Sequence, residues 1–315
     1  MLFIFLLACQ PDTPQSMDST PPEPVFWSPE QEGLFDAGLH SFSFESSHGR
    51  TLYVDVWYPA ERRELDILAE YEPFSFRGKA YRDAPIAKRA TSLIAFSHGL
   101  MSVRFQNAQL CEHLAQHGFT VIAPDHPGTS IFDLTTTVHA EDIFVRPDDI
   151  RHSVDHFLQK TDDANDFLFQ LVIDPNYIAI GHSLGSHTVM ALGGAEYDFE
   201  GFIQYCDQNP NERVCGLTQD VTEESVEQYG NVDSRVYATI PMSPGFWYTF
   251  GEGLRNLQNP FFVMGALDTV LNYETKHWQH FPISKRHLTT SFFPTQDIMD
   301  LQRCALSYLL LAKNV

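Results

Sequence analysis

The sequence predicts an α/β fold: a mostly parallel, eight-stranded sheet with helices on both faces and a lid-like insertion. From residue 92 onward, short apolar runs typical of buried strands alternate with longer segments of helical periodicity. Strands separated by helices form parallel sheets, and such sheets place functional sites at the carboxyl ends of the strands. The chain has 315 residues, is 43% hydrophobic and shows no internal repeat, so we expect one large domain.

The predicted sheet opens with an antiparallel hairpin. The segments Leu39–Phe44 and Leu52–Tyr58 alternate apolar and polar residues, and the Ser-Ser-His-Gly sequence between them suits a turn. A long polar excursion follows. Six further strands are then expected, at Ser92–Phe96, Phe119–Ala123, Tyr177–Ile180, Val236–Ile240, Phe261–Gly265 and Leu288–Phe293.

Helical patterns lie between and after these strands. They cover Val103–His117, Asp148–Lys160, Leu184–Gly194, Asn272–Phe281 and Asp297–Lys313. The segment from Glu196 to Arg235 interrupts the alternation, is acidic and is only weakly periodic. We interpret it as an insertion over the site, a candidate lid.

The first ten residues, MLFIFLLACQ, are a short apolar run ending in a cysteine. This ending resembles the bacterial lipoprotein signal, in which the cysteine, here Cys9, is lipidated and becomes the mature N-terminus. A hydrophobic N-terminus without a targeting role is the alternative, because no Lys or Arg precedes the run. The resemblance implies a signal peptide at 1–8, a Pro-, Ser- and Thr-rich tether at 9–30 and a folded domain at 31–315.

Lipidation of Cys9 implies export and anchoring to a bacterial membrane. Gln10, rather than Asp, follows the cysteine, which in a Gram-negative host indicates the outer membrane or cell surface. Elsewhere the chain has no run of about 18 apolar residues that could span a membrane. The 41 acidic and 20 basic residues give a net charge of −21, which argues against a nucleic-acid partner.

Four cysteines remain after Cys9. Cys206 and Cys215 bracket a polar loop that a disulfide would close, and export would place them where disulfides persist. Cys111 and Cys304 fall in predicted helices, where a buried free thiol is the commoner state. We therefore predict one disulfide, between Cys206 and Cys215.

The strongest chemical signal is the sequence Gly-His-Ser-Leu-Gly at residues 181–185, which follows a predicted strand and precedes a predicted helix. A Gly-x-Ser-x-Gly turn in this position holds the serine in a strained backbone and exposes its hydroxyl at the carboxyl edge of the sheet. The helix that follows directs its N-terminal amides toward charge that develops on a substrate. Ser183 is therefore the candidate nucleophile.

The other candidates follow neighbouring strands. Such an elbow takes one oxyanion donor from the residue after the serine and another from the loop after an earlier strand, which indicates the amides of Leu184 and Leu100. In that loop, His98 is expected to order the backbone. Asp268, at the end of the strand FFVMG, is the candidate acid, with a helix N-cap as the alternative. Asp125 is interpreted as a turn residue.

Four segments, in this order and spacing, resemble the platelet-activating-factor acetylhydrolase branch of α/β hydrolases and its dienelactone-hydrolase-like bacterial relatives. They are IAFSHGL, HGFTVIAPDHPG, IAIGHSLGSHTVM and VMGALDTV, and the resemblance runs over residues 36–313. It implies the α/β-hydrolase fold, with Ser183 as nucleophile, Asp268 as acid, and Leu100 and Leu184 lining the oxyanion hole. The implied reaction is hydrolysis of short acyl esters, of small molecules or lipids, through an acyl-enzyme and without metal or cofactor.

The catalytic histidine departs from this family. It should follow the last strand, where a gapless comparison places Gln296, and glutamine cannot act as a general base. His287 is the nearest candidate, but it begins that strand, about 17 Å from the catalytic edge. His277 and His280 are further candidates. Three alternatives therefore stay open: an active serine carboxylesterase, a catalytically impaired binding or scaffold lipoprotein, and a cutinase-like polyesterase.

Overall fold

The computed structural model describes residues 32–133, 138–212, 215–216, 221–224, 232–257, 259–267 and 288–294. Within these ranges, no helix combines the length and the apolar character needed to cross a membrane.

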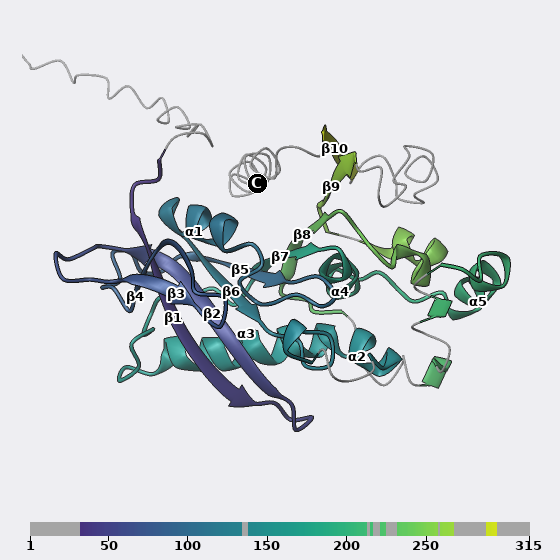
Figure 1. The fold of residues 1–315 in the computed structure, drawn as a ribbon, viewed down its shortest axis with the longest axis horizontal. Coiled ribbons are helices and arrows are strands. Elements are labelled where there is room, and N and C mark those ends of the chain that lie inside the picture. The colour runs from purple at the N-terminus through teal and green to yellow at the C-terminus, as the bar shows by residue number, and fades with distance from the viewer. Residues whose placement is uncertain are drawn as a thin grey trace, which may run out of the picture.

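The described strands form one ten-stranded sheet with the order β10-β9-β8-β7-β5-β6-β2-β1-β4-β3 (Figure 1). The strands are β1 Asp36–Glu45, β2 Thr51–Ala60, β3 Leu68–Tyr71, β4 Phe76–Arg82, β5 Ser92–Ser97, β6 Phe119–Pro124, β7 Tyr177–His182, β8 Val236–Met242, β9 Phe261–Leu267 and β10 Leu288–Pro294. From β6 to β10 all neighbouring pairs are parallel, whereas β1 pairs with β2, and β2 with β6, in antiparallel fashion. This confirms the predicted mostly parallel sheet with an opening hairpin.

The sheet has two strands more than the eight that were predicted. β3 and β4 form an antiparallel hairpin with an irregular register, within the segment interpreted as a polar excursion. Only Ala69, Tyr71 and Ala80 of this hairpin are buried in the core, so hydrophobic alternation gives little signal. A buried chain of hydrogen bonds also anchors the hairpin: Trp57 Nε1 donates to Tyr71 Oη at 2.8 Å, and that hydroxyl donates to Glu112 Oε1 at 2.9 Å.

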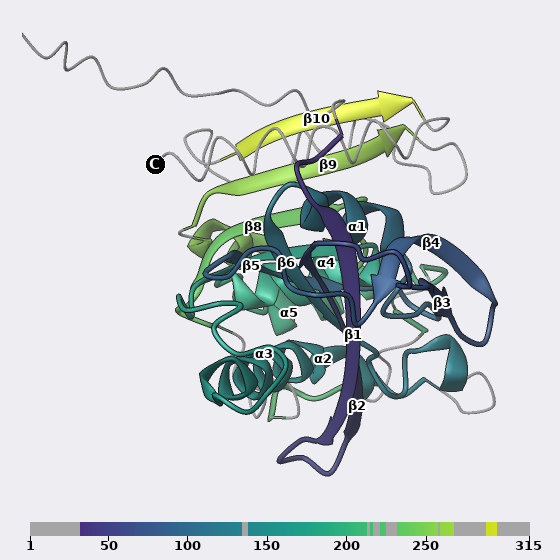
Figure 2. The ribbon, with the colours of Figure 1, turned by 90° about the vertical axis from the view of Figure 1, so that its left-hand side faces the viewer.

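Helices cover both faces of the sheet (Figures 1 and 2). The described helices are α1 Ala108–Gln116, α2 Ala140–Phe144, α3 Arg146–Asp162, α4 Leu184–Leu192 and α5 Phe199–Gln208, with 3-10 turns η1 Ile131–Asp133, η2 Trp247–Thr249 and η3 Gly251–Asn256. Residues of α1 pack with one face of the central strands, and residues of α3 and α4 pack with the other. Along β5, Ile94 joins the first cluster and Leu93 the second, as expected for a strand buried on both faces.

Two helices begin at other residues than the sequence predicted. α1 begins at Ala108 rather than Val103, because Val103 and Phe105 pack into the core as part of a turn that precedes the helix. α3 begins two residues before Asp148, with Pro147 in its first turn, a position that proline favours. The predicted helices Asn272–Phe281 and Asp297–Lys313 lie outside the described residues.

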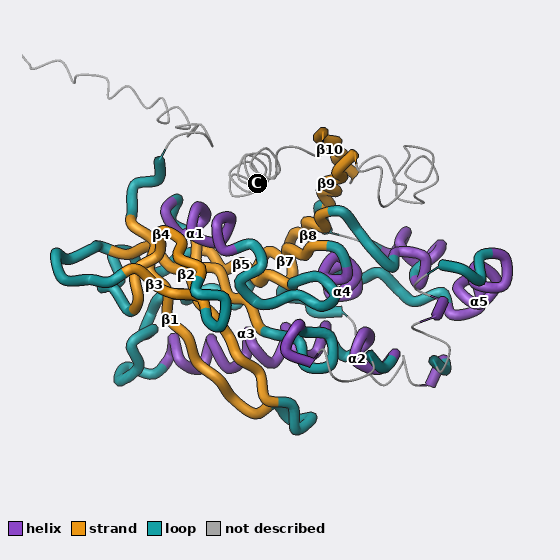
Figure 3. The backbone as a smooth tube through the Cα atoms, viewed as in Figure 1, coloured by secondary structure: helices purple, strands orange, loops and turns teal. Residues whose placement is uncertain are grey.

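The insertion after α4 contains α5 and lies at the end of the molecule opposite the β3–β4 hairpin (Figure 3). Cys206, on α5, forms the predicted disulfide with Cys215. Cys111 is a buried free thiol on α1, also as predicted. Cys9 and Cys304 lie outside the described residues.

Candidate active site

The order of strands reverses between β5 and β7, which places a topological switch point there. From β5 the chain crosses to β6 on one side and then returns to β7 on the other. Ser97 at the end of β5 is in register with Gly181 of β7, so the loop after β5 and the turn after β7 begin side by side. Open α/β sheets bind ligands in the crevice at such a point, beyond the carboxyl ends of the strands. The two motifs singled out in the sequence therefore meet.

The turn after β7 has the geometry expected of a nucleophile elbow. Ser183 has φ 53° and ψ −115°, a backbone region that is strained for any residue other than glycine, and it caps α4. Its N–H donates to Met242 O on β8 at 2.9 Å. A Cβ on Gly181 would overlap the carbonyl of Gly185, and one on Gly185 would overlap the carbonyl of Ser97. Both flanking glycines are thus required by close backbone packing.

Two loops approach the half-buried Ser183 residue. A Cβ built on Gly99, in the loop after β5, would lie 3.4 Å from Ser183 Cβ. A Cβ built on Gly245, in the loop after β8, would lie 3.6 Å from Ser183 Oγ, and the Gly245 amide donates to Ser183 O at 3.1 Å. Because both approaching residues are glycines, backbone rather than side chains lies next to the hydroxyl.

Gln106 joins the loop after β5 to the elbow. Its Oε1 accepts a hydrogen bond from the Gly99 amide at 2.8 Å, and its Nε2 donates to His182 Nδ1 at 2.7 Å. Two residues after Gly99, the Met101 amide donates to Thr129 O at 2.8 Å. These contacts hold Leu100, between Gly99 and Met101, on both sides.

His98 orders this loop, the role expected from the sequence. Its ring is fully buried, and Nδ1 donates to Gly99 O at 2.7 Å while Nε2 accepts from the His126 amide at 3.0 Å. Burial, and then the nearby positive charge of Arg146, hold the pKa of His98 well below its usual range. The ring is therefore neutral, which its acceptor role at Nε2 requires.

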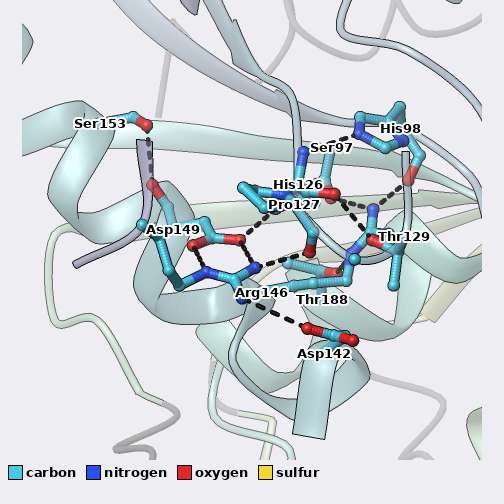
Figure 4. Close-up of polar contacts among 12 residues, drawn as sticks. Ser97, His98, His126, Pro127, Thr129, Asp142, Arg146, Asp149, Ser153 and Thr188 are labelled. Atoms are coloured by element: carbon cyan, nitrogen blue, oxygen red, sulfur yellow. Dashed lines mark hydrogen bonds and ion pairs between the residues drawn. The ribbon is translucent and has the colours of Figure 1, made fainter. Parts of the chain in front are cut away.

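A buried charged network under the site was not foreseen in the sequence (Figure 4). Arg146 is fully buried and donates to oxygens of three different segments. Beside it, Arg50 pairs with Asp149 at 2.9 Å, and Asp149 accepts from His126 Nδ1 at 2.9 Å. The local sequence feature that points to Arg146 is the proline after it. Proline favours the first turn of a helix, so Pro147 indicates that the helix begins at Arg146.

Apolar side chains gather around Leu184. The cluster joins Leu184 to α2 and to the insertion; its buried members are Ile143, Phe144, Val145 and Val221, and Leu100, Val138, Ala140, Tyr197, Phe199 and Phe246 pack against them. The two residues predicted to supply oxyanion donors thus share one apolar environment with residues of the insertion.

Asp125 has a structural role, in line with its interpretation as a turn residue. It accepts hydrogen bonds from the Arg104 amide at 2.7 Å and from the Arg104 guanidinium at 2.6 Å. Within the described residues, no group of three or more His, Cys, Asp or Glu side chains is placed to hold a metal ion. The remaining candidates lie outside the described residues: Asp268, His277, His280, His287 and Gln296.

Comparisons with known proteins agree with this architecture. Residues 88–206 match the family model described as Hydrolase_4, serine aminopeptidase, S33. Among solved structures, the chain is similar to a ferulic acid esterase from Streptomyces cinnamoneus, with 17% sequence identity and a TM-score of 0.52 over 85% of this chain and 75% of that one. Among curated proteins, no sequence matches this chain. The sheet and these likenesses lead to one conclusion: the chain has the α/β-hydrolase fold.

Proposed function

We propose that the protein is a serine carboxylesterase that hydrolyses short-chain acyl esters, acetylhydrolase- or lipase-like, through an acyl-enzyme. The observation that carries the proposal is the elbow, in which Ser183 combines a strained backbone with a position at the switch point of the sheet. Such strain persists only where surrounding structure enforces it, and it clusters at functional sites. The resemblance of the sequence motifs to the acetylhydrolase branch and the esterase among similar structures support the ester substrate.

The amides of Leu100 and Leu184 are the proposed oxyanion donors. Leu184 is the first residue of α4, and N–H groups in a first helical turn have no acceptor within the helix. Leu100 lies between two amides that already donate to Gln106 and Thr129. Donors fixed before the substrate arrives stabilise a developing oxyanion without reorganising.

The apolar cluster around Leu184 supports an acyl substrate rather than a charged one. Tyr197, Phe199 and Val221 of the insertion belong to it, so we propose that segment 196–235 acts as a lid over the acyl group. Lipidation of Cys9 would hold the enzyme at a bacterial membrane, where lipid esters are available as substrates. The mechanism needs no metal or organic cofactor.

Asp268 is the proposed triad acid. It follows directly on Leu267, the last residue of β9, at the carboxyl edge of the sheet. Leu267 pairs with Pro294, the last residue of β10, so β9 and β10 end side by side. This is where a catalytic histidine is needed.

The sequence offers Gln296 rather than histidine after β10. His287 precedes Leu288, and Leu288 pairs with Phe261 at the opposite end of β9. Seven strand residues separate the two edges, about 20 Å. This direction of β10 favours an impaired triad over a base supplied by His287.

A catalytically impaired binding or scaffold protein is the second candidate, and the Gln296 slot is the observation that favours it. A cutinase-like polyesterase would use the same residues and differ in the cleft. Losing one triad member leaves a residual rate of roughly 10³- to 10⁴-fold over water in serine hydrolases. A weak esterase is therefore consistent with the first proposal, whereas a complete lack of acylation would favour the second.

The first test is acylation of Ser183. Purified protein should hydrolyse p-nitrophenyl acetate, and a fluorophosphonate probe should label the peptide that contains Ser183. Ser183→Ala should abolish both, while Ser102→Ala, on the loop after β5, should retain them. Labelling of wild-type protein at another residue, or a Ser183→Ala variant with most of the wild-type rate, would contradict the assignment.

The second test concerns the base. If the histidine slot is vacant, Gln296→His should raise kcat/KM about tenfold or more, and His287→Ala should change little. If His287 is the base, His287→Ala should abolish activity and Gln296→His should have no effect. Both variants are measured on the same activated ester.

A further inference from the structure

The side chain of Arg146 connects three segments of the candidate site. Its Nε donates to Thr188 Oγ1 at 3.1 Å, and Nη1 donates to Thr129 Oγ1 at 2.9 Å. Nη2 donates to Ser97 Oγ at 3.2 Å and to the carbonyl oxygen of His98 (Figure 4). One planar group therefore binds four oxygens whose relative positions it fixes.

Each of the three segments adjoins a reacting group of the proposed mechanism. Thr188 lies on α4, five residues after Ser183. Ser97 and His98 lead into the loop that contains Leu100. Thr129 belongs to the loop after β6, and its carbonyl accepts the Met101 amide, the next residue after Leu100. Arg146 thus contacts the elements on either side of both proposed oxyanion donors.

Packing alone gives no reason for a cation at this place. Arg146 is fully buried, and all four of its acceptors are neutral oxygens. The nearby carboxylate of Asp149 is bonded to Arg50 and His126, not to Arg146. Burial lowers the pKa of Arg146 to about 9, so it remains charged at neutral pH. Since buried ionic groups are often replaced by apolar residues without loss of stability, a role beyond stability is indicated.

The His98 ring extends the effect of Arg146 to the oxyanion donor itself. Arg146 holds the backbone carbonyl of His98, and the neutral ring donates from Nδ1 to Gly99 O. The Gly99 carbonyl and the Leu100 N–H belong to the same peptide group, so fixing the Gly99 carbonyl fixes the direction of the Leu100 N–H. A hydrogen bond at the carbonyl also polarises the peptide and strengthens its N–H as a donor.

We propose that Arg146 is a positioning residue for the proposed esterase reaction. Its guanidinium sets the Gly99–Leu100 peptide against α4, so that the Leu100 amide points to the site of the oxyanion before substrate binds. The inference rests on the proposed function for its catalytic consequence. The loop geometry that it describes is independent of the reaction.

The test uses Arg146→Lys, which replaces the guanidinium by an amine with one donor centre and so loses the planar fork. Without the fork, the loop should sample other orientations, and the amides of Gly99 and Met101 should exchange with deuterium about tenfold faster or more. On p-nitrophenyl acetate, kcat should fall about 10- to 100-fold with KM changed less than about threefold, because the lost interaction acts in the transition state. If Arg146 had a purely structural role, the variant would yield less folded enzyme, but the folded enzyme would keep the wild-type kcat.

A milder pair of variants keeps the inference testable if Arg146→Lys fails to fold. Thr188→Val removes one acceptor of Arg146, whereas Thr239→Val removes a buried hydroxyl that has no hydrogen-bond partner in the part of the chain that the structure describes. Both changes are nearly isosteric. Thr188→Val should lower kcat about three- to tenfold and speed exchange in residues 97–102, and Thr239→Val should do neither. Equal kcat and equal exchange in the two variants would overturn the inference.

Failure of the inference and failure of the proposed function give different results. If wild-type protein neither hydrolyses the ester nor reacts with fluorophosphonate at Ser183, the proposed function fails, and the exchange data alone decide the role of Arg146. If wild-type protein is active but a folded Arg146→Lys variant keeps kcat within twofold and exchanges as wild type, Arg146 does not position the loop.

Discussion

Three histidines that are fully buried in the described part of the chain should make the protein sensitive to mild acid. His98, His126 and His187 have no exposed surface, and burial lowers the pKa of each, that of His187 to about 3. In the unfolded chain a histidine has a pKa of about 6.5. Below that value the unfolded state binds protons that the folded state does not, so the free energy of unfolding falls as the pH falls.

The size of the effect follows from this difference in proton binding. For one histidine that stays neutral in the folded state, lowering the pH from 7.5 to 5.5 reduces the free energy of unfolding by about 1.4 kcal/mol. Three such groups give about 4 kcal/mol, a large part of the stability of a typical domain. Burial raises the pKa of Asp125 and Asp149, so at lower pH these groups bind protons in the folded state and oppose the loss of stability. The measurements therefore end at pH 5.5.

His187 allows this prediction to be tested in one variant. Both of its ring nitrogens are buried without a hydrogen-bond partner among the described residues, and its ring packs against Tyr197 and Phe250. In His187→Phe, the loss between pH 7.5 and 5.5 should be about 1.4 kcal/mol smaller than in wild type, measured by urea unfolding followed by tryptophan fluorescence. Tyr197→Phe is the control, because it removes a buried hydroxyl that also lacks a partner but does not titrate in this range.

The change in the free energy of unfolding with pH does not depend on how well the phenylalanine ring packs, because packing does not alter the number of protons bound. A His187→Phe variant that loses as much stability as wild type would refute the reasoning. So would a Tyr197→Phe variant whose loss shrinks by the same amount.

Three further predictions concern the elbow and the N-terminus. Ser183→Gly should have a free energy of unfolding about 1 to 2 kcal/mol higher than Ser183→Ala, because glycine adopts φ 53° without strain. Equal urea midpoints for the two variants would show that the turn stores no strain. Gly185→Ala should cost about 3 kcal/mol or more, because its Cβ would overlap Ser97 O, and a stable, active variant would contradict the close packing. Cys9→Ser should release the protein from the detergent phase of membrane extracts, whereas continued partition with membranes would rule out the lipid anchor.

The sequence predicted those parts of the fold that depend on local pattern. The runs that became β5 to β10 are apolar and bounded by turns. The glycines at 181 and 185 identified the elbow, because a Cβ at either position would overlap the backbone of Gly185 or Ser97. The disulfide between Cys206 and Cys215 was predictable because the two cysteines bracket a short polar loop. In each case the signal lies within a few residues.

What the sequence did not reveal depends on residues that only the fold brings together. Arg146 and its acceptor Ser97 are 49 positions apart, and nothing in either segment suggests the contact. The β3–β4 hairpin was missed because few of its residues reach the core, and the contacts that hold it, such as the hydrogen bond from Tyr71 to Glu112, join residues far apart in the sequence. The catalytic base stays a prediction, because His287 and Gln296 lie outside the described residues.

The β3–β4 hairpin has a further consequence for the behaviour of the protein in concentrated solution. An exposed edge strand with free N–H and C=O groups can pair with another molecule and begin aggregation. At this edge of the sheet the outermost strand, β3, is only four residues long and has an irregular register, and the pair Arg77–Glu70 places charge across it. The hairpin is therefore a poor template for strand addition. It also covers the start of β1, a longer and more regular strand, because β4 pairs with Gly38 and Leu39 there.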